Sequence, residues 1–376
     1  MKYICLLLAL CLVCTACTTP ISTPSDIPPA ENTVPLRGVW LSFLELDSAL
    51  KSADIPTAKA YIDSVMQTCK DKHLNAVFFH VRAHSDAYYA SDIFPIAAAI
   101  KPLVQAGFDP LAYAVDSAHA AGLQLHAWIN PYRIGETLDN AVCEDVFLQD
   151  EVYYYVPTSL TAQRKILDGV RELVNSYTID GVQYDDYFYP AGIPKEAQIF
   201  ENIPKGIAVG DTRRAAVNTL ITATYQIAHS RAGCVFGVSP AVNIFRNRET
   251  LYADVGFWLK TAGCVDYVCP QLYTGFVHET LPFDTALAQW QALPRAAGVK
   301  LYAGLAVYKA GTADDYAGIG KTEWQISSDI LSRQCMAADT AKWDGVALFR
   351  YAYVINPSGE IAKKETAALI DYISQY

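Results

Sequence analysis

The sequence predicts a (β/α)8 barrel, an α/β fold in which eight parallel strands are each followed by a helix. Three observations support this prediction. Eight strand-like runs alternate with segments of helical period along the chain. The 376 residues lie within the range of roughly 200 to 400 that such barrels span. Polar residues recur at alternate positions of successive strands and become more frequent toward the carboxyl ends, where barrel enzymes hold their active sites.

The expected elements follow in order. Strands are expected over residues 38–43, 76–82, 123–130, 181–185, 235–242, 265–273, 301–308 and 345–351. Helical periodicity predicts helices over residues 57–72, 110–121, 159–176, 212–232 and 327–341, several of which end in glycine, as helix C-caps often do. A doubly wound open sheet is the alternative, but no glycine-rich dinucleotide fingerprint follows the first strand.

Alternate residues of a strand point to opposite sides, so each strand has an inner and an outer face. The outer positions, such as Val77 and Phe79, are apolar and suit packing under helices. The inner positions are Phe78, His80 and Arg82 on the second strand, Gln124, His126, Trp128, Asn130 and Tyr132 on the third, Gln183 and Asp185 on the fourth, Ser239 and Asn243 on the fifth, and Gln271 and Tyr273 on the sixth.

The first 35 residues have the pattern of an export signal and a tether. Residues 1–16 contain an apolar run from Ile4 to Cys14, which is too short to span a bilayer and is typical of a secretory signal. The run ends in Val13-Cys14-Thr15-Ala16-Cys17, which resembles a bacterial lipobox with Cys17 as the lipidated residue. Residues 17–35 are rich in Ser, Thr and Pro and predict a tether, and residues 36–376 predict the barrel. Simple secretion is the alternative, and both interpretations place the protein outside the cytoplasm.

The charge of the chain limits its partners. The formal net charge of -10 argues against nucleic acid or an anionic membrane surface as the main partner. A lipid anchor at Cys17 is therefore the one membrane attachment that we expect. Nearby His80, His84 and Asp86 lack any dedicated metal signature, so we expect neither a metal nor another cofactor. The oligomeric state cannot be deduced from the sequence.

The segment Thr178 to Pro190 runs from a strand into two adjacent carboxylates bracketed by aromatic residues. Aromatic rings supply flat apolar surface for sugars, and carboxylates supply the acid chemistry of glycosidic cleavage. By strand parity Asp185 points into the barrel mouth, and the side chain of Asp186 is expected to diverge from it unless a bulge or the strand end turns the two together. Asp185 is accordingly the leading nucleophile or transition-state stabiliser. The alternatives are a structural hydrogen-bond acceptor for Asp185 and a loop cap for Asp186.

These motifs together resemble glycosyl-hydrolase-like family 10, exported bacterial barrel proteins that are often lipoproteins. The resemblance covers nearly the whole body of the chain. Its motifs are Arg37-Gly38-Val39-Trp40-Leu41, Asn75 to Arg82, Gly107-Phe108-Asp109-Pro110-Leu111, His126 to Arg133, Asp180-Gly181 through Pro190, Phe236-Gly237-Val238-Ser239-Pro240 and Pro270-Gln271-Leu272-Tyr273. The resemblance implies hydrolysis of glycosidic bonds, and some members look like enzymes that cut peptidoglycan strands stripped of their peptides. His80 stands where the family commonly has glutamine.

A second carboxyl group is needed besides Asp185, because glycosidases usually place two carboxyl groups on either side of the scissile bond. The strand also resembles the chitinase pattern Asp-Gly-x-x-x-Asp-x-Glu, but Tyr187 occupies the position of the catalytic glutamate. Asp186 is one candidate for the acid. Glu45 and Asp86 lead the candidates from other loops, ahead of Glu136 and Glu279, although each of these four also suits a solvated loop charge.

Several further side chains are candidates for substrate binding at the mouth, and each also has a structural alternative as core, ion-pair partner or buried amide. They are Arg82, His84, His126, Trp128, Asn130, Tyr132, Arg133, Tyr187, Tyr189, Asn243, Gln271, Tyr273 and Tyr353. We therefore expect an exported glycoside hydrolase that acts on cell-wall or related amino-sugar polysaccharide. A non-catalytic carbohydrate-binding barrel lipoprotein is the main alternative, and a polysaccharide deacetylase is a third.

Overall fold

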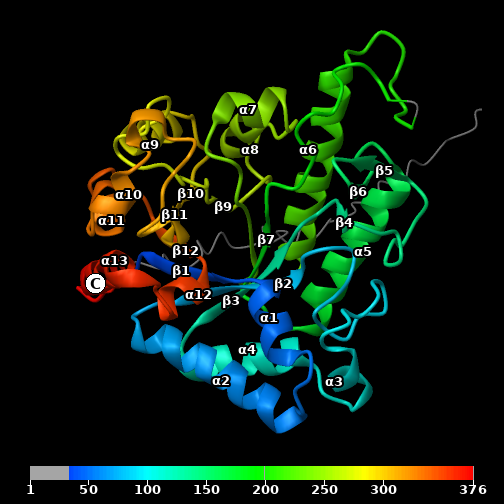
Figure 1. The fold of residues 1–376 in the computed structure, drawn as a ribbon. Coiled ribbons are helices and arrows are strands. Elements are labelled where there is room, and N and C mark those ends of the chain that lie inside the picture. The colour runs from blue at the N-terminus through cyan, green and yellow to red at the C-terminus, as the bar shows by residue number, and fades with distance from the viewer. Residues whose placement is uncertain (1–33, 199, 376) are drawn as a thin grey trace, which may run out of the picture. The chain divides into compact units, whose positions relative to one another are not determined.

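A computed structural model describes residues 34–198 and 200–375 of the chain. Within the unit that begins at Val34, parallel strands form a sheet with helices packed around it (Figure 1). The order of the hydrogen-bonded strands is β10-β9-β8-β7-β3-β2-β1-β12-β11. Their bounds are β1 Leu36–Leu41, β2 Ala76–Arg82, β3 Gln124–Ile129, β7 Gly181–Tyr184, β8 Val235–Val238, β9 Tyr267–Val268, β10 Lys300–Leu301, β11 Ala303–Ala306 and β12 Gly345–Phe349.

The sheet closes on itself through β10 and β11, which are separated by Tyr302 alone. β10 pairs with β9, whereas β11 pairs with β12 at the other end of the order. An additional bridge joins Gln271 to Gly304 across this junction. The two short strands therefore occupy the seventh position of a nearly closed barrel, where the sequence predicted one strand over residues 301–308.

Helices follow the strands and cover the outer face of the sheet. α2 packs against α4 and α5 packs against α6, so these pairs form two flanks of the barrel (Figure 1). The helices are α1 Phe43–Leu50, α2 Ile55–Asp71, α3 Lys101–Gln105, α4 Pro110–Ala121, α5 Leu160–Ser176, α6 Val209–Ala228, α7 Ile244–Glu249, α8 Val255–Lys260, α9 Phe283–Gln291, α10 Glu323–Ile326, α11 Ile330–Thr340, α12 Tyr351–Ile355 and α13 Gly359–Ile373, with 3-10 turns η1 Val307–Lys309 and η2 Gly318–Gly320.

Local sequence explains where these helices begin and end. α4 begins after Asp109, whose carboxylate accepts the backbone N–H of Leu111, and Pro110 occupies the first turn. Proline suits that position because its missing N–H has no partner inside the helix. α4 ends at Gly122, whose φ of 79° is readily adopted only by glycine. The five helices predicted from periodicity are all present, with ends shifted by a few residues.

A small antiparallel sheet at the end of β3 was not predicted. It contains β4 Arg133–Gly135, β5 Val146–Gln149 and β6 Val152–Tyr155 in the order β4-β6-β5. In this sheet Arg133 pairs with Tyr154 of β6. The chain that leaves β3 is therefore held in a defined path as it passes the carboxyl end of the barrel.

The interior of the barrel is rich in aromatic residues. One apolar cluster inside it includes Trp40, Phe78, Trp128 and Tyr267, whereas the larger cluster lies between the outer strand faces and the helices. Gly237 on β8 makes room for this interior, since a Cβ there would lie 2.1 Å from the ring of Tyr267. The candidate site lies above Trp128, at the carboxyl end of the barrel.

The N-terminal predictions lie outside the described residues. These are the signal peptide over residues 1–16, lipidation at Cys17 and nearly all of the tether. Among the described helices, none is both long enough and apolar enough to cross a membrane.

Candidate active site

The two adjacent aspartates lie where β7 ends, at the carboxyl end of the barrel. β7 ends at Tyr184, and the backbone N–H of Asp185 still bonds to Ile129 of β3 at 3.0 Å. The carboxyl groups of Asp185 and Asp186 lie close enough to shift each other's pKa, and Asp185 is 9% exposed. The strict alternation ends with the strand, and the following turn brings the two carboxyl groups together.

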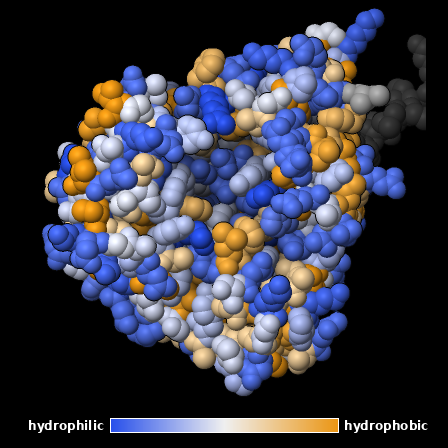
Figure 2. Space-filling model, viewed as in Figure 1, coloured by the Kyte–Doolittle hydropathy of each residue, from blue (hydrophilic) through white to orange (hydrophobic). Residues whose placement is uncertain are grey.

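The amide of Gln271 holds this aspartate pair in place. Its Nε2 donates to Oδ1 of Asp185 at 2.9 Å and to the carbonyl oxygen of Ser239 at 3.1 Å, and it also reaches Asp186. The sequence prediction of a polar role for Gln271 at a strand end thus has a clear geometric counterpart. Figure 2 shows a hollow lined mainly by hydrophilic residues in the region where β7 and β9 lie in Figure 1.

Burial raises the pKa of both aspartates. It raises the pKa of Asp185 well above the ordinary range of an aspartate, and the neighbouring charge of Asp186 raises it further. Burial also raises the pKa of Asp186, but this rise is opposed by hydrogen bonds from Gln271 and Asp185 and by the charge of Arg246. The arrangement therefore favours a proton on Asp185 and a negative charge on Asp186.

A stacked pair of rings forms the floor beneath the aspartates. Trp128 and His80 lie with ring centroids 3.6 Å apart and planes inclined by 15°. The indole N–H of Trp128 has no hydrogen-bond partner within normal distance among the described residues. It nevertheless lies near Asp185 and lowers the pKa of that carboxyl group. Burial keeps the pKa of His80 well below its usual value, so this imidazole is neutral. Trp128 therefore packs in the apolar interior and also forms the floor of the site. The sequence had suggested either a core position or a substrate-binding ring for it.

Arg133 and Tyr187 form a second feature near the pair. The Arg133 guanidinium lies 5.0 Å from the centroid of the Tyr187 ring, a cation–π distance. The charges of Asp185 and Asp186 contribute to the raised pKa of Tyr187, after burial, which places Tyr187 beside the pair. The Nε of Arg133 is buried without a hydrogen-bond partner, and no carboxylate in the described part of the chain forms an ion pair with it. This cation is available to a ligand.

Glu45 has a structural role that the sequence analysis did not identify. It lies in the first turn of α1, where it closes a capping box with Ser42. Its Oε2 also accepts an ion pair from Arg350 at 2.6 Å, and its Oε1 accepts the backbone N–H of Ala352 at 3.1 Å. With these bonds formed, Glu45 joins α1 to the segment that follows β12, and both of its carboxylate oxygens are occupied by structural partners.

Asp86 is the other carboxylate predicted from a loop. Burial and then the charge of Asp47 raise the pKa of Asp86 to about 6. Asp86 is not among the groups that shift the pKa of Asp185, whereas Asp186 is. Asp86 is thus perturbed, but the structure does not bring it together with the aspartate pair.

Arg82 and Asn130 do not face the mouth. A shift of register between His80 and Arg82 turns the end of β2, so Arg82 lies 4.6 Å from the ring centroid of Phe94 and donates to the Pro131 carbonyl at 2.8 Å. The expectation that Arg82 shares the inner face of His80 is wrong because of this irregularity. Asn130 is buried and donates to the Ala83 carbonyl at 2.7 Å.

Four further candidates are occupied in the scaffold. His126 lies lower in the barrel against Tyr267, and burial lowers its pKa to about 4. Tyr132 is fully buried. Asn243 is exposed and caps α7 by accepting the backbone N–H of Arg246 at 2.8 Å. Tyr189 is buried and donates to Glu201.

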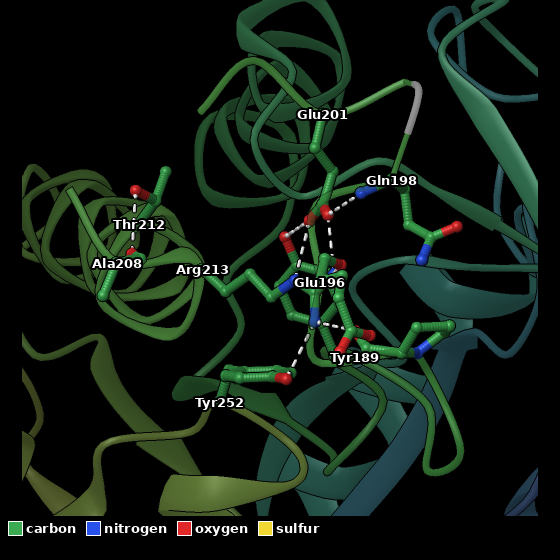
Figure 3. A network of polar contacts seen from close by, with 9 residues as sticks. Tyr189, Glu196, Gln198, Glu201, Ala208, Thr212, Arg213 and Tyr252 are labelled. Carbon is green, nitrogen blue, oxygen red and sulfur yellow. Dashed lines mark hydrogen bonds and ion pairs between the residues drawn. The ribbon is translucent and has the colours of Figure 1, made fainter. Parts of the chain in front are cut away.

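Tyr189 belongs to a buried network that fixes the loop after the aspartates (Figure 3). Arg213 of α6 donates to both carboxylate oxygens of Glu201, at 2.9 and 2.6 Å. The same guanidinium donates to the carbonyl oxygens of Pro194 and Glu196 and to the hydroxyl of Tyr252. Neither partner of this ion pair has an exposed side chain. The network positions the segment that follows β7 without contacting the aspartate pair.

Residues that the sequence analysis missed lie at the ends of the seventh and eighth strands. Tyr308 and Phe349 are half-buried beside Tyr273, with ring centroids 6.0 and 5.8 Å from it. Tyr308 ended one predicted strand and Phe349 lay two residues before the end of another, and these positions were the signal available. No group of three His, Cys, Asp or Glu side chains in the described ranges is arranged to hold a metal ion.

Comparison with known proteins gives a consistent family and fold. The family model described as glycosyl hydrolase-like 10 matches residues 35–318. Glycosyl hydrolase DigH of Escherichia coli strain K12 is 28% identical over 412 residues, covering 93% of this chain and 92% of DigH. Glycosyl hydrolase YngK of Bacillus subtilis strain 168 is 30% identical over 313 residues, covering 73% of this chain and 61% of YngK.

Solved structures confirm the barrel. The glycoside hydrolase domain of PgaB (BpsB) from Bordetella bronchiseptica superimposes with a TM-score of 0.58 at 15% identity, covering 90% of this chain and 99% of that domain. The catalytic domain of a β-amylase from Paenibacillus polymyxa gives a TM-score of 0.53 at 12% identity, covering 89% and 98%. At such identities the likeness concerns the fold, and it agrees with the predicted (β/α)8 architecture.

Proposed function

Because the chain belongs to the glycosyl hydrolase-like 10 family, we propose that it is an exported glycoside hydrolase that cleaves cell-wall or related amino-sugar polysaccharide. Family membership confirms the resemblance drawn from the motifs. The observation that carries the proposal is the pair of adjacent aspartates at the carboxyl end of the barrel, where Asp185 is buried and accepts a hydrogen bond from Gln271 at 2.9 Å. Perturbed titratable groups at this end of a barrel are typical of catalytic sites.

The proposed chemistry uses the two aspartates in different protonation states. Asp185, which favours the protonated form, donates a proton to the oxygen of the leaving sugar. Asp186, which favours the charged form, stabilises the positive charge that develops on the sugar ring. Water then adds to the anomeric carbon and its proton returns to Asp185, which restores the resting state. This assignment revises the sequence-based hypothesis of Asp185 as nucleophile, because a carboxyl group that holds a proton in the resting protein is ready to act as an acid.

The adjacency of the two aspartates distinguishes this site from the two common arrangements. Retaining glycosidases place their carboxyl groups roughly 5 to 5.5 Å apart, and inverting enzymes roughly 6.5 to 9.5 Å apart, on either side of the bond. Asp185 and Asp186 are consecutive residues at the end of one strand, so both act from the same side of the sugar. Glu45 does not supply the missing opposite carboxylate, since Arg350 and the capping box of α1 occupy it.

Arg133 supports a cell-wall substrate. Its guanidinium stacks on Tyr187 beside the aspartate pair and lacks an acidic partner among the described side chains. A planar guanidinium favours carboxylate ligands, and a tyrosine face favours a pyranose ring. A sugar that carries a carboxylate, such as the lactyl ether of muramic acid, satisfies both groups at once.

Incubation of the soluble domain, residues 34–376, with peptidoglycan strands stripped of peptides tests this function. Mass spectrometry of the products should show shortened strands with the wild type and none with Asp185→Asn. Unaltered cleavage by Asp185→Asn would remove Asp185 from the mechanism, and intact strands with the wild type would argue against hydrolysis of this glycan.

A carbohydrate-binding protein without turnover is the second candidate. The observation that favours it is the adjacency of the two aspartates, which leaves the opposite side of the bond without a carboxylate. This candidate predicts saturable binding of the same strands with no products after prolonged incubation. Binding followed by calorimetry and product analysis on one sample separates the two functions.

The proposal includes export and anchoring through a lipid on Cys17. The apolar run of residues 4–14, followed by small residues before Cys17, supports it. Metabolic labelling with a radioactive fatty acid should label the full chain but not the Cys17→Ala variant. Equal labelling of both would exclude Cys17 as the lipidated residue.

A further inference from the structure

Four aromatic rings form a row on one side of the aspartate pair. The row consists of Tyr273 from the segment after β9, Tyr308 from η1, Phe349 from the end of β12 and Tyr353 from α12. The row runs from Tyr273 to Tyr308 to Tyr353, with centroids 6.0 and 6.1 Å apart. Phe349 packs beside the first two rings, with its centroid 5.8 Å from that of Tyr273 and 6.1 Å from that of Tyr308. Such spacings are typical of aromatic rings in contact.

The row begins at the proposed reacting centre. The charge of Asp185 contributes, after burial, to a pKa of Tyr273 well above its ordinary value, which places this hydroxyl beside the aspartate pair. Phe349 also approaches the floor of the site, with its ring centroid 6.3 Å from that of Trp128. The row is therefore continuous with the proposed catalytic centre.

The row ends at the exposed rim. Tyr353 is 37% exposed, and the Arg350 guanidinium lies 5.2 Å from the centroid of its ring. Arg350 is itself held by Glu45 at 2.6 Å. The ion pair therefore fixes the outer end of the row on one side while leaving the tyrosine accessible to solvent.

The partial exposure of these rings is not required by the barrel. The interior is already filled by Trp40, Phe78 and Tyr267, which are almost fully buried. In contrast, the four rings of the row keep part of their surface exposed in a protein that buries most of its large aromatic side chains. Adjacent rings with exposed surface supply what the apolar faces of successive pyranose units pack against.

We propose that this row is a glycan track, which binds the sugar units that continue beyond the one held at Asp185 and Asp186. The ligand is a polysaccharide strand, because the row runs from the acid centre to solvent and offers more than one ring. The chemical identity of the strand rests on the proposed function, whereas the track requires only that a long glycan binds. The row gives the protein a preference for long strands over short fragments.

Binding in the Asp185→Asn background tests the track without requiring turnover. The probes are peptide-free peptidoglycan strands and their disaccharide unit, N-acetylglucosaminyl-N-acetylmuramic acid, measured by isothermal calorimetry. Adding Tyr308→Ala and Tyr353→Ala should weaken the binding of strands by about tenfold to a hundredfold. Binding of the disaccharide should change much less, because it occupies the aspartate pair alone.

Two control variants separate ring loss from other effects. Tyr353→Phe keeps the ring and should bind strands as tightly as its parent. Tyr113→Ala removes a half-buried tyrosine on α4, at the flank of the barrel, and should also leave strand binding unchanged. Circular dichroism of each variant establishes that it is folded.

The outcomes are distinct. Equal strand affinity with and without the Tyr308 and Tyr353 rings overturns the track, as does the absence of saturable strand binding by the Asp185→Asn protein. If the rings matter for binding but the wild type releases no products, the track stands and hydrolysis fails. If the wild type cleaves strands and the rings do not matter, hydrolysis stands and the track fails.

Discussion

The buried ion pair between Arg213 and Glu201 gives a sharp prediction about the loop after the aspartates. In the Arg213→Met variant, the Glu201 carboxylate stays buried, with no exposed side-chain surface, and loses both charged hydrogen bonds. Breaking a buried pair from one side costs about 3 to 5 kcal/mol, since an uncompensated charge remains. The carbonyl oxygens of Pro194 and Glu196 lose a donor as well, so the upper half of this range is expected.

The loss can be measured by guanidinium and thermal unfolding of residues 34–376. An unfolding entropy of about 2.1 cal/mol/K per residue gives roughly 0.7 kcal/mol per kelvin for this unit, so the thermal midpoint should fall by roughly 6 to 7 K. The double variant Arg213→Met with Glu201→Leu should regain much of this stability, because no charge is then left buried.

Arg171→Met is the matched control. Arg171 forms an ion pair of the same length, 2.6 Å, with Asp168, but the two side chains are 51% and 35% exposed. Its loss should cost about 0 to 1 kcal/mol, because solvent screens the exposed pair. Equal destabilisation by Arg213→Met and Arg171→Met would refute the reasoning, as would a double variant less stable than Arg213→Met.

Three further predictions follow from named contacts. Burial raises the pKa of Asp86 to about 6, so the folded state disfavours the charged form of this carboxyl group. Asp86→Asn should therefore raise the free energy of unfolding by up to about 3 kcal/mol at pH 8. Urea unfolding should show that this gain disappears below about pH 4, where Asp86 is protonated in both the folded and the unfolded state. Asp186→Asn removes a neighbouring negative charge and should lower the pKa of Asp185, measured by carboxyl carbon chemical shifts against pH; an unchanged titration would contradict the effect of Asp186 on Asp185. Gly237→Ala would place a Cβ 2.1 Å from the ring of Tyr267 and should lower the free energy of unfolding by about 1 to 3 kcal/mol. An unchanged midpoint of urea unfolding would mean that the Tyr267 ring moves aside without loss of stability.

The barrel could be predicted because its signals are local and repeated. Apolar alternation located the strands, and helical periodicity with caps such as Asp109 and Gly122 located the helices. The seventh strand shows the limit of this approach, since Tyr302 separates two short segments with different partners. Pairing between distant segments closes the barrel, and no local pattern contains that information.

The site could be predicted only in part, for physical reasons. Strand position identified Asp185 and Gln271, and the structure places them in contact. Parity no longer applies at Asp186 because the strand ends at Tyr184, and it failed at Arg82 because a register shift turns the chain.

Long-range partners account for the other differences. Glu45 is held by Arg350, which lies more than 300 residues away in the sequence, so its local surroundings gave no sign of that ion pair. The aromatic row has the same cause, since its rings come from distant segments that only the closed barrel brings together.

The central claim is that Asp185 and Asp186 act together on a glycosidic bond. The most direct test is the mass spectrum of peptide-free peptidoglycan strands after incubation with the wild type, Asp185→Asn and Asp186→Asn. The account predicts shortened strands with the wild type and intact strands with both variants, although each variant still binds the glycan. Strands shortened equally by all three proteins would contradict it.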